Sequence, residues 1–189
     1  MDRPELVVVR HGETTWSRSG KHTGRTDIPL TPHGEDQARA LGRALAGRRF
    51  ALVLASPLAR AWRTAELAGL AARPCEDLRE WDYGDYEGRT TPEIRTLVPG
   101  WTVWTHPCPG GERAGQVAAR AERVLAAALA AGGDVALVGH GHHLRVLAAR
   151  WCGLAPEQGR LLALDPGSVS VLAHERDTPV IGSWNHVPI

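Results

Sequence analysis

Short apolar runs recur along the chain, and each one ends abruptly at a polar or glycine-containing segment. Residues 6–9, 51–55 and 135–138 are nearly all aliphatic and are bounded by polar or turn-forming residues. Runs of this length without alternation are typical of strands that are buried on both faces of a parallel sheet. The pattern therefore predicts three central strands.

Longer amphipathic stretches separate these strands. Thr31-Pro32 and Ser56-Pro57 each place an N-capping side chain before a proline, which favours a helix start. Apolar residues then recur at helical spacing, and glycines follow several of the predicted ends. We expect helices over the stretches 31–47, 58–70, 117–132 and 144–151.

Strands that alternate with helices imply a three-layer α/β/α sandwich with a mostly parallel central sheet. Residues 73–76 fit an edge strand, and a strand pair at 169–171 and 180–184 would close the other edge. Residues 77–112 are rich in Trp, Tyr, Pro, Gly and acids and contain one short helix from Thr91-Pro92, which indicates an insertion over a site. We predict one domain over 1–189, with this insertion as a short lid.

Charge and cysteine content narrow the classes of partner. The formal net charge is +1, so no general basic field exists to favour nucleic acid or an anionic membrane as partner. Lys21 is the only lysine, and the other basic residues are arginines, which bind phosphate and carboxylate bidentately. The three cysteines lack the spacing of a disulfide framework or a zinc site. The N-terminal apolar run is too short for a signal peptide or a membrane span. Together with the cysteine pattern, it favours the cytoplasm as the location.

Two predicted strands end in a histidine followed by glycine. Val9 leads into Arg10-His11-Gly12, and Val138 leads into Gly139-His140-Gly141. Ligands in such sheets bind at the carboxyl ends of the strands, so both histidines should reach one rim. The glycine would permit a tight turn, one ring nitrogen would bond a backbone carbonyl, and the other would face the ligand as a neutral nucleophile.

Arginines near this rim point to phosphate as the ligand. Arg10 adjoins the first histidine, and Arg60 lies in the first turn of the helix that follows Ser56-Pro57. Together with a protonated His140 they would supply the positive charge that a metal supplies in other phosphoryl-transfer sites. The "HGHH" at 140–143 also permits a metal interpretation, but it lacks paired carboxylates or cysteines, and at most one of His142 and His143 can face the pocket.

Several motifs, in one order, resemble the histidine phosphatase superfamily, also called phosphoglycerate-mutase-like. They are "RHGETTW" at 10–16, "HTGRTDIPLTPHG" at 22–34, "SPLARAWRTA" at 56–65, "LREWDYGDYEG" at 78–88 and "VGHGHHLR" at 138–145. The composition alone predicts about one Arg-His pair, so the order carries the weight. The resemblance implies that His11 becomes phosphorylated, that Arg10, Arg60 and His140 complete the phosphate pocket, and that Glu80 is the proton donor.

Further residues are expected to line the phosphate and substrate pocket. We assign this role to Ser17, Thr23, Gly24, Gly141, Trp81 and Tyr83. Ser17 departs from the family's usual asparagine and has a shorter reach. Asp82 is the alternative acid if the loop turns differently, Trp101 and Trp104 are alternatives as pocket walls, and His22 is the exception among histidines expected at the surface.

The stretch "EWDYGDYEG" resembles the phosphatase branch of the superfamily, because mutases carry Glu-Arg-His-Tyr-Gly there and a longer insertion. "WSRSGKHTG", "TTPEIR" and "VWTHPCPGGE" are similar to a branch with bacterial acid phosphatases and fungal sedoheptulose-bisphosphatases. We therefore predict a cofactor-free, metal-independent phosphatase that acts on a small phosphorylated metabolite. The alternatives are a phosphoglycerate-mutase-type enzyme and a non-catalytic phospho-ligand binding module. The oligomeric state stays open, with a homodimer among the alternatives.

Overall fold

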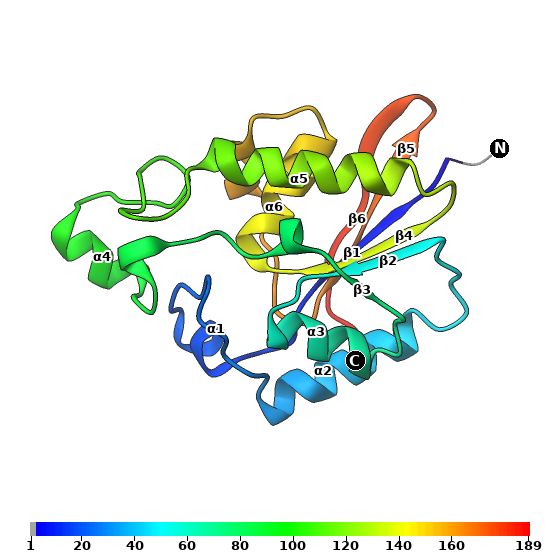
Figure 1. Cartoon of the computed structure of the whole chain (residues 1–189), viewed down its shortest axis with the longest axis horizontal. Helices are drawn as coiled ribbons and strands as arrows, with labels where there is room; N and C mark the ends of the chain where they lie inside the picture. Colours follow the sequence, from blue (N-terminus) through cyan, green and yellow to red (C-terminus); the bar gives the residue numbers. More distant parts are fainter. Residues whose placement is uncertain (1–2) are drawn as a thin grey trace.

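A six-stranded sheet forms the centre of the molecule (Figure 1). The computed structural model describes residues 3–189. The strand order is β3-β2-β4-β1-β5-β6, and the first four strands run parallel. They are β1 (Leu6–Arg10), β2 (Leu52–Ala55), β3 (Arg73–Pro74) and β4 (Val135–Gly139). The predicted central strands and the edge strand are confirmed, although β3 is only two residues long.

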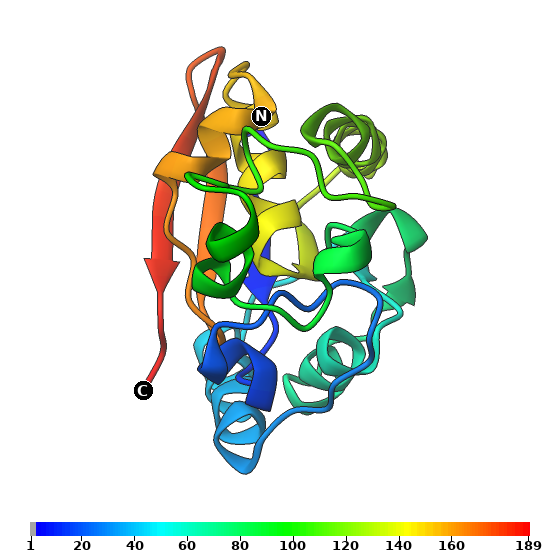
Figure 2. The same ribbon diagram turned by 90° about the vertical axis from the view of Figure 1, so that its left-hand side faces the viewer.

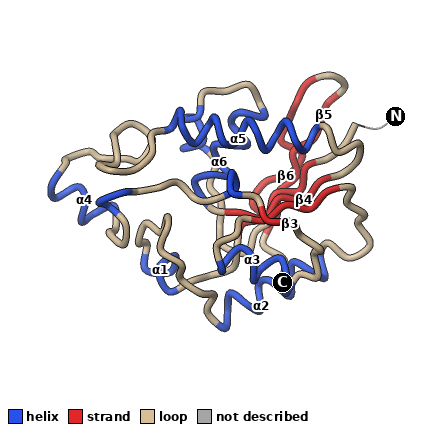
Figure 3. The backbone as a smooth tube through the Cα atoms, viewed as in Figure 1, coloured by secondary structure: helices blue, strands red, loops and turns tan. Residues whose placement is uncertain are grey.

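The strands of the C-terminal region pair antiparallel and complete one edge of the sheet. β5 (Val169–Glu175) pairs with β1, and β6 (Thr178–His186) pairs with β5. This confirms the predicted strand pair and the mostly parallel sheet. The strands lie together as one twisted layer between the helices (Figure 3).

Helices cover both faces of the sheet, and strand alternation decides which side chains they meet. α2 (Pro32–Ala44) and α3 (Ala59–Leu67) pack on the face that carries Val7 and Val9. α5 (Ala114–Leu129) and α6 (Gly141–Trp151) pack on the opposite face, which carries Leu6 and Val8. Figures 1 and 2 show these two helix pairs on either side of the strands. The predicted three-layer sandwich is therefore confirmed.

The start of α3 differs from the prediction. Its N-cap is Leu58, which has no capping side chain, so Ser56-Pro57 precedes the helix instead of capping it. The carboxylate of Asp27 accepts hydrogen bonds from the Ala59 N–H, at 2.9 and 3.1 Å. A residue distant in sequence thus supplies the cap, which local pattern alone cannot reveal.

Several short helices were not predicted, and α1 (Thr15–Ser19) and η3 (Pro156–Leu161) are the longest of them. α1 is closed by a capping box in which Thr14 and Ser17 bond each other's backbone N–H groups. The 3₁₀ helix η3 packs against α6. Both are too short to show a helical period in the sequence.

The segment 77–112 extends beyond the sheet, with α4 (Thr91–Leu97) at its far end (Figure 1). Two 3₁₀ turns lie near its start, η1 (Glu76–Leu78) and η2 (Gly84–Tyr86). The Glu112 N–H donates to the Asp82 carbonyl at 2.8 Å, so the two ends of the segment meet. Within residues 3–189, none of the helices combines the length and apolar character that crossing a membrane requires.

Candidate active site

Neighbouring strands bring the two predicted histidines to one rim of the sheet. In the β1–β4 register Arg10 lies opposite Gly139, so His11 and His140 follow side by side. A cavity of about 170 Å³ opens here. Its lining includes seven of the predicted site residues, namely Arg10, His11, Ser17, Thr23, Glu80, Tyr83 and Gly141.

His11 lies on the cavity wall with only 5% of its surface exposed. Its Nδ1 donates a hydrogen bond to the Gly12 carbonyl at 2.7 Å, since a carbonyl can only accept. Burial, and then the positive charges of Arg60 and Arg10, hold the pKa of His11 well below its usual value. The ring is therefore neutral near pH 7, and its Nε2 carries a free lone pair, as the sequence predicted.

The glycine after His11 has a role that differs from the predicted tight turn. Gly12 is absent from the described positions with left-handed backbone. A Cβ at this position would lie 2.9 Å from the Gly34 Cα and would collide with the Gly34 carbonyl. Glycine is therefore needed because two backbone segments approach closely, which fixes the loop that carries His11.

Arg10 lines the cavity and keeps one buried donor without a partner in the part of the chain that the structure describes. Its Nη1 donates to the Leu164 carbonyl, whereas its buried Nε has no partner among residues 3–189. The guanidinium packs on Gly141, where a Cβ would lie 3.2 Å from its Cζ. Arg10 is thus held in a fixed position at the cavity wall by Leu164 and Gly141.

Arg60 and His140 lie one layer behind the cavity, and neither lines it in this structure. The Arg60 Nη2 donates to the carbonyls of Thr23 and Gly24 at 3.0 Å, and its Nη1 to Thr26 at 3.0 Å. The His140 ring packs edge-on against His11, with 5.1 Å between centroids. Arg60 therefore acts on His11 through its charge, and Gly24 contributes its carbonyl to Arg60 instead of contacting this cavity.

The prediction of a protonated His140 is wrong for this structure. The Arg60 Nε donates to His140 Nδ1 at 3.2 Å, so that nitrogen carries no proton. His140 Nε2 lies 2.8 Å from the Ser56 hydroxyl. Burial, followed by the charge of Arg60, lowers the pKa of His140 well below its usual value. His140 is therefore a neutral hydrogen-bonding partner.

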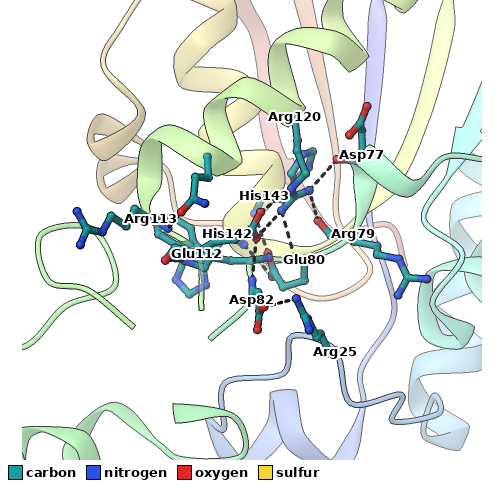
Figure 4. Close-up of polar contacts among 12 residues, drawn as sticks. Arg25, Asp77, Arg79, Glu80, Asp82, Glu112, Arg113, Arg120, His142 and His143 are labelled. Carbon is teal, nitrogen blue, oxygen red and sulfur yellow. Dashed lines mark hydrogen bonds and ion pairs between the residues drawn. The ribbon is translucent and has the colours of Figure 1, made fainter. Parts of the chain in front are cut away.

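Glu80 reaches the cavity from the start of the segment 77–112, and its carboxylate lies at the N-terminus of α6 (Figure 4). Oε1 accepts from the N–H groups of Trp81 and His143, both at 2.8 Å. Oε2 accepts from the His142 N–H at 3.0 Å. Asp82, the alternative acid, instead pairs with Arg25 at 2.6 Å and does not line this cavity.

Two of the remaining predicted contacts change. The Ser17 hydroxyl lines the cavity but is committed to the Thr14 backbone, donating to its carbonyl at 3.0 Å. Trp81 is fully buried and donates from Nε1 to the Glu112 carbonyl at 2.9 Å, because the chain turns it away from the cavity. Trp81 therefore supports the Glu80 loop from behind.

Aromatic packing explains where the other tryptophans lie. Trp101 packs on His22 with 5.3 Å between ring centroids, and Trp104 packs on His142 at 5.1 Å. Neither lines the cavity, so they support its walls without forming them.

Five cavity residues were missing from the predicted set, and they are Gly20, Lys21, His22, His142 and Arg145. Burial lowers the pKa of His22 to about 4. The Tyr83 hydroxyl lies 2.6 Å from His142 Nδ1. Arg145 stacks on Trp104, with its Cζ 4.7 Å from the ring centroid. All five stand inside the "WSRSGKHTG" and "VGHGHHLR" motifs, which was the available signal.

His142 faces the cavity, and His143 is buried with both ring nitrogens unpartnered among the described residues. Residues 3–189 contain no cluster of three His, Cys, Asp or Glu side chains with the placement of a metal site.

The residues that the family resemblance implied, two histidines, two arginines and one carboxylate, lie at one rim of the sheet. The family model described as "histidine phosphatase superfamily (branch 1)" matches residues 6–187. The chain belongs to this superfamily.

Similar proteins match most of the chain. An acid phosphatase of Mycobacterium tuberculosis is 42% identical, over 96% of this chain and 93% of its own. The sedoheptulose 1,7-bisphosphatase of Saccharomyces cerevisiae is 34% identical, over 82% of this chain and 70% of its own. The solved structure of an open reading frame product of Mycobacterium tuberculosis superposes with a TM-score of 0.94 at 40% identity, covering 97% of this chain and 98% of that one.

Proposed function

We propose that the chain is a phosphatase that hydrolyses a small phosphorylated metabolite through a covalent phosphohistidine on His11. The observation that carries this proposal is the state of His11 itself. Its Nδ1–H is fixed on the Gly12 carbonyl, so a neutral Nε2 with a free lone pair faces a cavity that also presents Arg10. This is the arrangement that nucleophilic attack on a phosphoryl group requires.

In the first step the His11 Nε2 forms a bond to phosphorus as the bond from phosphorus to the ester oxygen breaks. Arg10 binds the phosphoryl oxygens, and Arg60 adds positive charge from behind. The Gly12 carbonyl stabilises the cationic ring that results, because it accepts from Nδ1–H. Glu80, in its protonated form, gives its proton to the leaving oxygen, and the product alcohol departs.

In the second step water attacks the phosphohistidine. Glu80, now a carboxylate, takes a proton from the water as its oxygen bonds to phosphorus and the bond from nitrogen to phosphorus breaks. Inorganic phosphate leaves, and both His11 and Glu80 return to their starting states. Oε2 accepts only one backbone N–H, so it is the oxygen that carries the proton.

We propose that this chemistry proceeds without a metal, because Arg10 and Arg60 supply the positive charge for the phosphoryl oxygens. The segment 77–112 would act as the lid of a single domain, since it contributes Glu80 and Tyr83 to the cavity. The names of the two curated relatives favour a sugar phosphate or a similar phosphomonoester as the substrate. Cys75, Cys108 and Cys152 form no disulfide, which favours the cytoplasm as the location.

Phosphate release in excess chelator tests this function. We expect release from a panel of sugar phosphates, phosphoglycerates, nucleotides and phosphopeptides to persist in the chelator and to be strongest on a small sugar phosphate. Loss of all turnover that a divalent ion restores would contradict the metal-free mechanism. Conversion of a phosphoglycerate without net phosphate release would establish a mutase instead.

A further inference from the structure

Arg120 of α5 holds the backbone of the loop that carries Glu80 (Figure 4). Its Nη1 donates to the carbonyls of Asp77 and Arg79, at 2.8 and 2.9 Å. Its Nη2 lies 3.4 Å from the Glu80 carbonyl. One guanidinium thus contacts three carbonyls within four consecutive residues, immediately before and at the candidate acid.

The same guanidinium is paired with Glu112, where the segment 77–112 ends. Nε and Nη2 of Arg120 bind the two carboxylate oxygens of Glu112, each at 2.8 Å. Glu112 Oε2 also accepts from the Asp82 N–H at 3.0 Å, and the Glu112 carbonyl accepts from Trp81 Nε1 at 2.9 Å. The pair therefore fixes the chain on both sides of Glu80.

Both side chains are largely shielded from solvent, with 15% and 20% exposed for Arg120 and Glu112. The pair is bidentate, which gives it a defined direction as well as charge. Every side-chain nitrogen of Arg120 donates a hydrogen bond, and each acceptor lies near one of the two ends of the segment 77–112. Contacts of this kind are typical of a pair that fixes the position of a loop. An ordinary surface ion pair is exposed and makes fewer of them.

We propose that the Arg120–Glu112 pair is a clamp that positions the Glu80 carboxyl for proton transfer to the leaving group. This inference rests on the proposed function, in which Glu80 is the acid. Arg120 touches no reacting atom, so it is a positioning residue. Releasing the clamp leaves His11 and Arg10 in place and displaces only the proton donor.

The leaving group distinguishes this role from a general structural one. An alkoxide such as that of glycerol phosphate leaves poorly without a proton, whereas p-nitrophenolate is a stable anion and leaves without one. Loss of the positioned acid should therefore slow glycerol phosphate selectively. The constant kcat/KM reports the steps up to the phosphoenzyme, which include this proton transfer.

The experiment compares kcat/KM for glycerol phosphate and p-nitrophenyl phosphate in wild type, Glu80→Gln, Arg120→Met and Glu112→Gln. We expect Arg120→Met and Glu112→Gln to lower kcat/KM for glycerol phosphate by about 10²-fold. The loss of kcat/KM for p-nitrophenyl phosphate should be smaller by a factor of at least about ten. Glu80→Gln should show the same selectivity. Adding Arg120→Met to Glu80→Gln should have no further selective effect, because the clamp acts only through Glu80.

Arg123→Met is the matched control. Arg123 lies one turn further along α5 and pairs with the Asp77 side chain at 2.6 Å, without contacting the carbonyls next to Glu80. We expect it to retain the wild-type ratio between the two substrates. If Arg120→Met fails to fold, Glu112→Gln and Arg120→Lys carry the test, since a lysine keeps the charge but loses the bidentate fork.

Equal losses on both substrates in the clamp variants would overturn the inference, as would additive losses in the double variant. If Glu80→Gln slows glycerol phosphate selectively and the clamp variants do not, Glu80 is the acid but the Arg120–Glu112 pair does not position it. Full phosphate release by His11→Ala would instead contradict the proposed function, and the clamp with it.

Discussion

At the scale of single residues, the chemistry depends on side chains whose protonation is set by what surrounds them. His11 is neutral because it is buried beside two arginines, and a carbonyl fixes its proton on Nδ1. His140 is neutral because it is buried and because Arg60 donates to it. The positive charge that acts on His11 thus comes from Arg60 and Arg10, and the nucleophile is left free to attack.

The close approach of Gly12 to the Gly34 backbone holds the loop that carries His11. We expect Gly12→Ala to lower the free energy of unfolding by about 3 kcal/mol, since its Cβ meets rigid Gly34 backbone. Gly115→Ala, in α5 with nothing within 4 Å of the new Cβ, should raise it by about 0.5 kcal/mol. Urea denaturation of both variants checks this. Equal stability of the two would mean that close packing at Gly12 does not hold the loop.

Sequence reasoning could find the residues that stand in motifs at strand ends, such as Arg10, His11 and Glu80. It could not find Arg120, because an arginine on the polar side of a long helix looks like a solvated residue until the loop it contacts is placed. Nor could it foresee that Arg60 and His140 bond each other, since they lie 80 residues apart.

Among the elements, the hydrophobic pattern predicted the central strands because both of their faces are buried, and the long helices because one face of each is buried. β1 and β4 are almost entirely buried, and their residues are correspondingly apolar. α1 and η3 were missed because so short a segment has no period to detect. The start of α3 was misplaced because its capping group comes from Asp27 and not from the neighbouring Ser56.

The Asp27 cap carries its own prediction. Asp27→Ala removes the acceptor of the Ala59 N–H and should cost about 1 kcal/mol, or about 3 °C in Tm. Asp36→Ala is a suitable control, because Asp36 is an exposed partner of Arg39 within one helix. Thermal denaturation measures both. A loss no larger than that of the control would show that Asp27 does not cap α3.

At the scale of the whole molecule, several buried histidines link stability to pH. Burial lowers the pKa in the folded state of five of them, His11, His22, His140, His142 and His143, the last to about 3. The unfolded chain binds protons at these residues below about pH 6.5, whereas the folded chain does not. Their contribution is therefore complete above that pH and is lost progressively as pH falls.

Below about pH 6.5 we expect the free energy of unfolding to fall as pH falls, by up to about 1.4 kcal/mol per pH unit for a histidine that stays neutral in the folded state. His143→Leu should reduce this slope by one histidine's share, since His143 is fully buried in α6. Urea denaturation at a series of pH values provides the measurement. A stability that stays level from neutral to mildly acidic pH would contradict the neutral state of these rings.

A trapped phosphoenzyme shows whether His11 carries the phosphoryl group during turnover. Mixing the enzyme with a phosphorylated substrate, quenching in alkaline denaturant and mapping peptides by mass spectrometry locates the added phosphate. We predict an acid-labile phosphate on His11 that is absent from His11→Ala, which should also release no phosphate. Phosphate on another residue, or release by His11→Ala at the wild-type rate, would show that His11 is not the nucleophile.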